Sequence, residues 1–599
     1  MRQAILCLAI AGMMLAGSVR AGAQMGGMPP MDGMQMIPPP DQLPVSVRMT
    51  GIGNSHITIK ANAEAQAWFD QGLSLLNDFW DYESARALEQ AVRTDPNCAM
   101  CYWGLAEALE SRGPEEKVYS DKALAEAVRL EGKASKTDRL YIDAAVAESH
   151  EKDDHTASIA IYRKLVKKEP KDIEARIFLA NAVEDGFDDN GEPKAGEKEK
   201  IAILEGVLKD APNDSAANHY WIHAMEPSNH PERAIPSAAL LASLAPTSGH
   251  MVHMPGHIYY RVGDYASADR WFAASTETDE RYMREQHVSV DEDWNYAHNL
   301  MYAIANLMEQ GRLADADALS DKLAGARGQL SATLYVWSAR DQMSRLSLRL
   351  PVALRVGDWN GVLAMLDNAN ITASEKTANL RFLKDELRDF AAGMLALDHG
   401  DLAAAQAASA EIDAGLWRQE QENKAAADAA KQKAAAAKPN AASAQPVTAP
   451  LNPDAMAEPL MRALNVASLE LRAGVVLLQG DSDSAKKMYA QAIAAEKKLG
   501  YHEPPFYIRP VAETEAEALL RAKDYAGARA AYQAALLERP QSGFELYGIA
   551  HADELAGNSA AAQVEYRTFL KAWPSADAKL PEVVHAHGAL GDAGVVAAK

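Results

Sequence analysis

Four histidines in the middle of the chain have a spacing that suits metal binding. His219 and His223 are four residues apart, and so are His253 and His257; each member of the second pair follows its counterpart by 34 residues. Residues four apart share one face of a helix, with β-carbons roughly 6 Å apart, so each pair forms a two-histidine clip. Imidazole suits zinc and copper, with iron the less favoured choice. The pattern therefore predicts a divalent transition-metal site if the two clips converge.

The elements that must position these histidines repeat with the same period. Pro212 and Pro246 are 34 residues apart, as are Pro540 and Pro574, and each follows an apolar, alanine-rich segment. Alanine favours helix and proline stops it, so each repeat is expected to be helix, tight turn, helix and stop. One helix pair leaves an apolar face open, and stacking of successive pairs completes the core.

The sequence of these repeats resembles the tetratricopeptide-repeat family. The family run G-x-x-Y-x-x-x-G-D-Y-x-x-A-x-x-x-F is matched by Gly256, Tyr259, Gly263, Asp264, Tyr265, Ala268 and Phe272. Further copies contain Gly480, Asp481, Ala485, Tyr489 and Ala492, and then Asp524, Tyr525, Ala528, Tyr532 and Pro540. Together with CAMCYWG at 98–104 and EPPFYIRP at 503–510, the histidine-rich central repeats look like a bacterial exported branch of this family. The resemblance implies an all-α superhelical solenoid, but no established reaction.

The resemblance also implies which side chains line the concave groove. It assigns the four paired histidines to groove positions of the first helix, and His250 to another. His298 occupies an equivalent position in the next recognisable repeat, and Glu226 offers a carboxylate ligand or base. The expected metal site is thus His219, His223, His250, His253, His257, His298 and Glu226, and the expected ligand groove adds Glu184, Tyr260 and Arg261.

Two other readings of the histidines stay open on the sequence alone. They could form a hydrogen-bonded structural cluster, or the spacing could be a coincidence. Pro255 lies between His253 and His257, and proline either kinks a helix or occupies its first turn. If the helix starts at Pro255, the second pair is not a true helical clip.

Charge narrows the choice of partners. The chain has 83 acidic and 60 basic residues, a formal net charge of −23. Such a surface repels phosphate backbones and anionic lipid headgroups, so we expect no nucleic-acid partner. Metal ions and cationic peptides are easier ligands, although an acidic surface can also serve solubility alone.

The N-terminus has the pattern of an exported protein. Arg2, the apolar run 4–16 and small residues near 21–23 follow the order of a signal peptide, which places the protein in the periplasm or outside the cell. No later stretch has the roughly 20 apolar residues of a transmembrane segment. Residues 24–61 are predicted to be a disordered leader. Its methionines either bind Cu(I) or belong to a simple flexible segment; they are Met25, Met28, Met31, Met34 and Met36. Cys98 and Cys101 can pair locally or carry redox chemistry.

The expected organisation separates two repeat arrays. A signal peptide (1–23) and the leader (24–61) precede an N-terminal array (62–416) with the histidines, a linker rich in Ala, Lys and Pro (417–458), a C-terminal array (459–575) and a tail (576–599). The chain lacks the common zinc-protease, hydrolase, phosphate and dinucleotide motifs. The leading hypothesis is a binding or scaffold protein whose groove takes a peptide, a partner protein or a metal ion. The alternative is a metal-dependent enzyme with a histidine-ligated zinc, copper or iron site.

Overall fold

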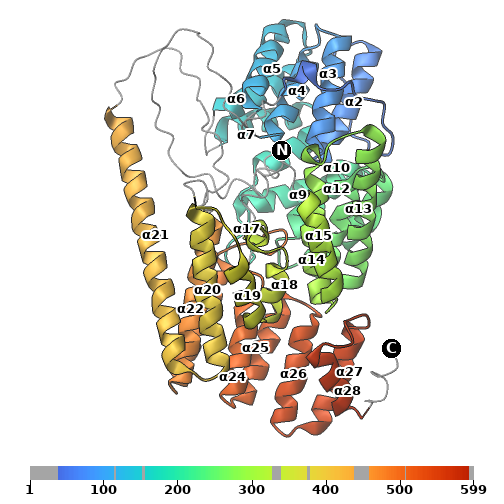
Figure 1. Cartoon of the computed structure of the whole chain (residues 1–599). Helices are drawn as coiled ribbons and strands as arrows, with labels where there is room; N and C mark the ends of the chain where they lie inside the picture. Colours follow the sequence, from blue (N-terminus) through green and yellow to red (C-terminus); the bar gives the residue numbers. More distant parts are fainter. Residues whose placement is uncertain are drawn as a thin grey trace.

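The computed structural model describes residues 38–113, 116–150, 155–326, 339–373, 378–436, 458–505 and 507–591. Within these ranges the regular elements are helices, apart from one isolated β-bridge between Phe187 and Pro193. Consecutive helices pair as hairpins, and the hairpins stack into a curved array (Figure 1). The prediction of an all-α solenoid of tetratricopeptide-like hairpins is confirmed.

The first half of the solenoid carries the histidine-rich repeats. Its helices are α2 (Ala63–Asn77), α3 (Asp81–Thr94), α4 (Ala99–Ser111), α5 (Lys117–Leu130), α6 (Asp138–His150), α7 (Thr156–Lys168), α8 (Ile173–Ala182), α9 (Ala195–Asp210), α10 (Ser215–Met225), α11 (Ile235–Leu244), α12 (Gly249–Arg261), α13 (Tyr265–Gln286), α14 (Trp294–Glu309) and α15 (Leu313–Ala326). Cys98 and Cys101 form a buried local disulfide at the start of α4, so local pairing is the alternative that the structure supports.

The second half continues the same construction. Its helices are α17 (Ala339–Leu346), α18 (Leu350–Val356), α19 (Trp359–Asn368), α20 (Ala378–Asp398), α21 (Leu402–Ala436), α22 (Glu458–Leu478), α23 (Ser482–Lys497), α24 (Val511–Arg521), α25 (Tyr525–Glu538), α26 (Gly543–Leu555), α27 (Ser559–Ala572) and α28 (Pro581–Ala589). Of the predicted linker, residues 437–457 lie outside the described part of the chain. No helix of the described ranges combines the length and hydropathy of a membrane span.

The hairpin of α12 and α13 shows why the repeat residues fold this way. Gly263 has φ +80°, which an L side chain rarely adopts, and ends α12 in a tight turn. The side chain of Asp264 then caps α13 by accepting from the backbone N–H of Ser267 at 3.0 Å. A β-carbon on Gly256 would lie 2.4 Å from the ring of Phe272, so only glycine lets the two helices approach this closely.

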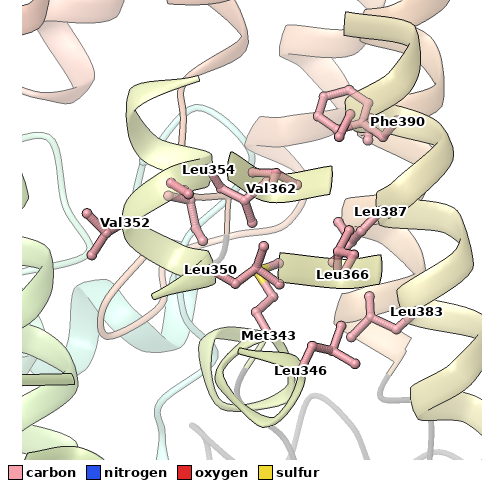
Figure 2. Close-up of a cluster of buried hydrophobic side chains, with 14 of the residues drawn as sticks. Met343, Leu346, Leu350, Val352, Leu354, Val362, Leu366, Leu383, Leu387 and Phe390 are labelled. Carbon is pink, nitrogen blue, oxygen red and sulfur yellow. The ribbon is translucent and has the colours of Figure 1, made fainter. Parts of the chain in front are cut away.

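The two predicted arrays share one hydrophobic core. Buried residues from Tyr296 of α14 to Ile508, beyond the linker, form a continuous cluster. Figure 2 shows its centre, where side chains of α18, α19 and α20 converge on Met343 and Leu346. Helices α20 and α21 both contact α22, so the linker interrupts the sequence without dividing the packing.

Residues 38–61 differ from the disordered leader that the sequence predicts. Ile52, Ile57 and Ile59 are buried, and Arg86 donates to the carbonyls of Pro44 and Val45 at 2.9 Å. The apolar side chains of this segment pack against the first hairpin. Its backbone carbonyls accept hydrogen bonds from side chains of that hairpin. The predicted signal peptide (1–23) and residues 24–37, with the five leader methionines, lie outside the described residues.

A buried arginine ties the two arrays together. Arg355 of α18 is fully buried and donates from Nε and Nη2 to both oxygens of Glu309 at 2.9 and 3.0 Å. Its Nη1 donates to Glu513 of α24 at 2.8 Å, and Glu545 of α26 lies 3.7 Å away. One guanidinium therefore compensates carboxylates from α14, α24 and α26.

Candidate metal centre

Six histidines converge from three first helices of neighbouring hairpins. The first histidine set is His219 and His223 of α10 with His250 of α12, and the second histidine set is His253 and His257 of α12 with His298 of α14. Within each set, one nitrogen of every ring lies within 4.8 Å of the others. The structure brings together all six histidines that the sequence singled out, but in two sets rather than in the single site that the sequence predicted.

Helix α12 supplies a histidine pair in spite of its internal proline. It runs without a break from Gly249 to Arg261 and contains Pro255. His253 and His257 lie one turn apart on the same face, with their Nε2 atoms 2.5 Å from each other. The alternative that the helix begins at Pro255 is therefore wrong.

Acceptors outside the first histidine set orient its rings. The Nδ1 of His219 lies 2.7 Å from the backbone carbonyl of Asn77, and the Nδ1 of His223 lies 2.7 Å from Oε1 of Glu226. The Nδ1 of His250 lies 3.0 Å from Oδ1 of Asn295. Because these oxygens accept, each Nδ1 carries the proton, and the lone pair of each ring is on Nε2.

Two rings of the second histidine set are held in the same way. The Nδ1 of His253 lies 2.7 Å from Oδ1 of Asn299, and that of His257 lies 2.6 Å from Oε2 of Glu226. The amide of Asn299 cannot be reversed, because its Nδ2 donates to the carbonyl of Phe272 at 2.9 Å. Ligating histidines generally bond to such outer acceptors, which set the tautomer and the ring orientation.

The resulting lone pairs face each other. The Nε2 atoms of His219 and His223 are 3.1 Å apart, and those of His253 and His257 are 2.5 Å apart. Two nitrogens on one tetrahedral zinc would be about 3.3 Å apart at bond lengths near 2.0 Å, so the first pair has nearly this spacing and the second pair must open to hold an ion. The Nε2 atoms of His250 and His298 are buried without a hydrogen-bond partner. Two unprotonated nitrogens repel unless a cation lies between them, so this arrangement favours a metal site over a hydrogen-bonded structural cluster.

A shared proton is a poor substitute for that cation. Burial lowers the pKa of His298 to about 3, and burial followed by neighbouring histidines lowers the pKa of His219, His250 and His253 well below the ordinary value. These four imidazoles are therefore neutral at physiological pH. Neutral imidazole is the form that ligates metals.

Two carboxyls lie between the sets. Glu226 bonds His223 with one oxygen and His257 with the other, so one carboxylate orients a ring of each set. Glu503 comes from the other half of the chain, and its Oε2 is 3.8 Å from Nδ1 of His257 and 3.9 Å from Nε2 of His298. Burial raises the pKa of Glu503 well above its ordinary value, and the nearby Glu226 adds to the effect.

The sequence predicted that the histidines line an open groove, but in the structure they are enclosed. His219, His253 and His257 have no exposed surface. The ring of Phe79, from the turn between α2 and α3, packs 4.7 Å from that of His219, while Tyr302 packs 4.5 Å from His257. The Tyr302 hydroxyl lies 3.2 Å from that of Tyr501. Curvature of the solenoid thus brings distant segments over the concave face, and the site becomes internal.

The three remaining groove residues have structural partners. Glu184 lies outside the histidine cluster and pairs with Lys200 at 3.0 Å. Tyr260 is buried, and its hydroxyl accepts from Arg539 of the C-terminal array at 3.1 Å. Arg261 donates from Nε to the backbone carbonyl of Glu226 at 2.8 Å, which steadies the residue that bonds both histidine sets.

Glu174 supports the first histidine set from further out and gives a pH-dependent prediction. It is buried and accepts from Nδ2 of Asn77 at 3.0 Å, while the carbonyl of Asn77 bonds His219. Burial, followed by repulsion from Asp214, raises the pKa of Glu174 to about 8. A carboxyl with a raised folded-state pKa stabilises the fold below its unfolded pKa, and this stability is lost as pH rises through about 8.

We expect Glu174→Gln in the metal-free protein to unfold thermally like the wild type at pH 5 and at a clearly higher temperature at pH 9. Each pKa unit corresponds to about 1.4 kcal/mol, so the benefit at high pH should be of the order of 2 kcal/mol or more. Circular dichroism melts at the two pH values measure it. An equal difference at both would contradict the assignment.

Comparison with known proteins identifies no family and no function for the chain. No family model matches the chain, and no curated protein matches it. The chain is similar to solved structures of the APC/C hetero-tetramer Cut9–Hcn1 (12% identity, 77% of this chain and 96% of that chain, TM-score 0.22) and of yeast Tom70 (13%, 88% and 95%, TM-score 0.27). The human IFIT1 dimer with m7Gppp-AAAA is a third (12%, 84% and 96%, TM-score 0.28). Likeness at these values gives no information about ligands.

Proposed function

We propose that this protein binds two transition-metal ions, one at each histidine set. The observation that carries the proposal is the pairwise approach of Nε2 atoms whose Nδ1 partners are all held by outer acceptors. Three nitrogens per ion leave coordination positions open, as in sites that act on a ligand rather than purely structural sites. The donors are nitrogens, which suits copper and zinc.

The concave surface at the histidines is taken by the chain's own residues, among them Phe79 and Glu503, which favours a metal ion over a peptide at this position. A protein or peptide partner for the remaining surface of the solenoid stays a proposal that follows from the repeat architecture. Export to the periplasm or beyond is likewise a proposal, and it depends on the signal-like residues 1–23.

Metal stoichiometry tests the proposed function. The protein is prepared without a histidine tag, stripped by a chelator and titrated separately with Cu(I), Cu(II) and Zn(II). We expect two ions per chain to be retained after gel filtration. The proposal is contradicted if the protein retains fewer than two ions per chain with each of the metals tested.

A third group of possible metal ligands must be disabled so that it does not add to the number of bound ions. His551, Glu554 and His585 lie at the partly exposed end of the C-terminal array and offer three ligand atoms. Glu554 accepts from His585 at 2.7 Å and from the hydroxyl of Tyr566 at 2.6 Å. The titration is therefore run in parallel on Glu554→Gln, which should retain both internal ions.

A further inference from the structure

We infer that the two ions are copper and that together they bind one molecule of dioxygen as a bridging peroxide. This inference rests on the proposed function and adds the identity of the metal and the class of ligand. It follows from the closeness of the two sets, from the small number of negative charges around them, and from the electron balance of the reaction.

The distances between rings of different histidine sets are similar to the distances between rings within one set. Within the sets, ring centroids of His219 and His223 are 4.8 Å apart and those of His257 and His298 are 5.8 Å apart. Between the sets, His250 lies 5.9 Å from His253, and His223 lies 6.3 Å from His257. Two ions held in this space can share one small ligand, as in known two-metal sites with ions roughly 4 Å apart.

The charge around the site favours monovalent ions at rest. The carboxyls that contact the imidazoles are Glu226 and Glu503, which supply at most two negative charges. Two zinc or ferrous ions would bring four positive charges into this buried site. Two Cu(I) ions bring two, which leaves less uncompensated charge in a site with so few carboxyls, and burial penalises any excess charge. Di-iron sites in helical proteins use several carboxylates instead.

Dioxygen binding then leaves the charge of the site unchanged. Each Cu(I) gives one electron to dioxygen, which accepts both, keeps its O–O bond as a single bond and becomes peroxide. Two Cu(II) ions with one peroxide carry the same total charge as two Cu(I) ions with neutral dioxygen. The step needs no proton and no reductant beyond the copper itself, which suits an interior lined by Phe79, Tyr302 and Trp294.

The Glu554→Gln protein, loaded with two equivalents of Cu(I) under nitrogen, is the material for the test. On mixing with oxygenated buffer, we expect one dioxygen to be consumed for every two copper ions, with a new peroxide-to-copper charge-transfer absorption. Acidification should then release one peroxide per pair. The oxygen electrode, the absorption spectrum and a peroxide assay measure these three quantities.

A protein with one set disabled provides the matched comparison. His219→Gln and, independently, His250→Gln should hold one copper and lose about tenfold or more of the dioxygen uptake per copper, because a single Cu(I) can supply only one electron. The inference is overturned if two bound Cu(I) ions consume no dioxygen, or if the one-copper variants consume as much per copper. Binding of two ions without dioxygen uptake would leave the proposed function standing, whereas failure to hold two ions would remove both.

Discussion

Replacing His253 by glutamine is expected to leave the protein with one bound metal ion instead of two. His253 contributes one of three nitrogens to the second histidine set, and its Nε2 faces that of His257. Glutamine keeps much of the volume but offers an amide in place of a lone-pair nitrogen. Even the loss of an outer partner of a ligand costs about 10–100-fold in metal affinity, so the loss of the ligand itself should exceed that. Metal analysis after gel filtration measures the count, and competition with a chelator measures the affinity.

Matched variants separate a lost ligand from a disturbed fold. His219→Gln should empty the first histidine set and leave the second, while Glu226→Gln should weaken both because one carboxylate orients a ring of each. His230→Gln changes an exposed histidine near α10 and should lose nothing. If His253→Gln retains both ions at wild-type affinity, or if His230→Gln loses one, the assignment of ligands is wrong.

The second large effect is expected for Arg355→Met. Burial alone would raise the pKa of Glu309, but Arg355 holds that pKa below its ordinary value. Methionine fills similar space and removes both guanidinium bonds of Glu309, whereas Glu513 keeps Arg509, whose Nε donates to it at 3.0 Å. Breaking a buried ion pair by removing one partner costs about 3–5 kcal/mol. We expect the thermal midpoint to fall by roughly 3 °C near neutral pH, because an unfolding entropy of about 2.1 cal/mol/K per residue is summed over a chain of 599 residues.

A control variant and the pH dependence distinguish the loss of the buried ion pair from the loss of any arginine. Arg349→Met removes a half-exposed arginine that pairs with Asp317 and Asp321, and a surface pair of this kind contributes about 0–1 kcal/mol. The deficit of Arg355→Met should shrink as pH falls, because protonated carboxyls no longer need a cation. Equal midpoints for the two variants, or a deficit that grows in acid, would contradict the role of Arg355.

The ligands of the candidate centre could be read from the sequence because they follow a local rule. A period of 34 residues places equivalent side chains on neighbouring first helices, and a separation of four places two on one face. His219, His223, His253 and His257 obey both rules. His250, His298 and Glu226 followed from the family positions, and the structure brings all seven together.

The residues that the sequence did not reveal reach the site from outside this period. Asn77 ends α2, Phe79 lies in the turn between α2 and α3, and Glu503 lies between α23 and α24 of the C-terminal array. Their approach depends on the curvature of the whole solenoid, which no local pattern encodes. Asn295 and Asn299 did carry a signal, since they are four apart on the helix of His298 and bond His250 and His253. Residues 38–61 were misjudged because proline and glycine nearby masked the buried isoleucines.

The most direct measurement is anomalous diffraction from crystals of the copper-loaded protein, with data on both sides of the copper absorption edge. Our account predicts two anomalous peaks among α10, α12 and α14, one bonded by Nε2 of His219, His223 and His250, and the other by His253, His257 and His298. A single peak, or peaks only beside His551 and His585, would contradict it.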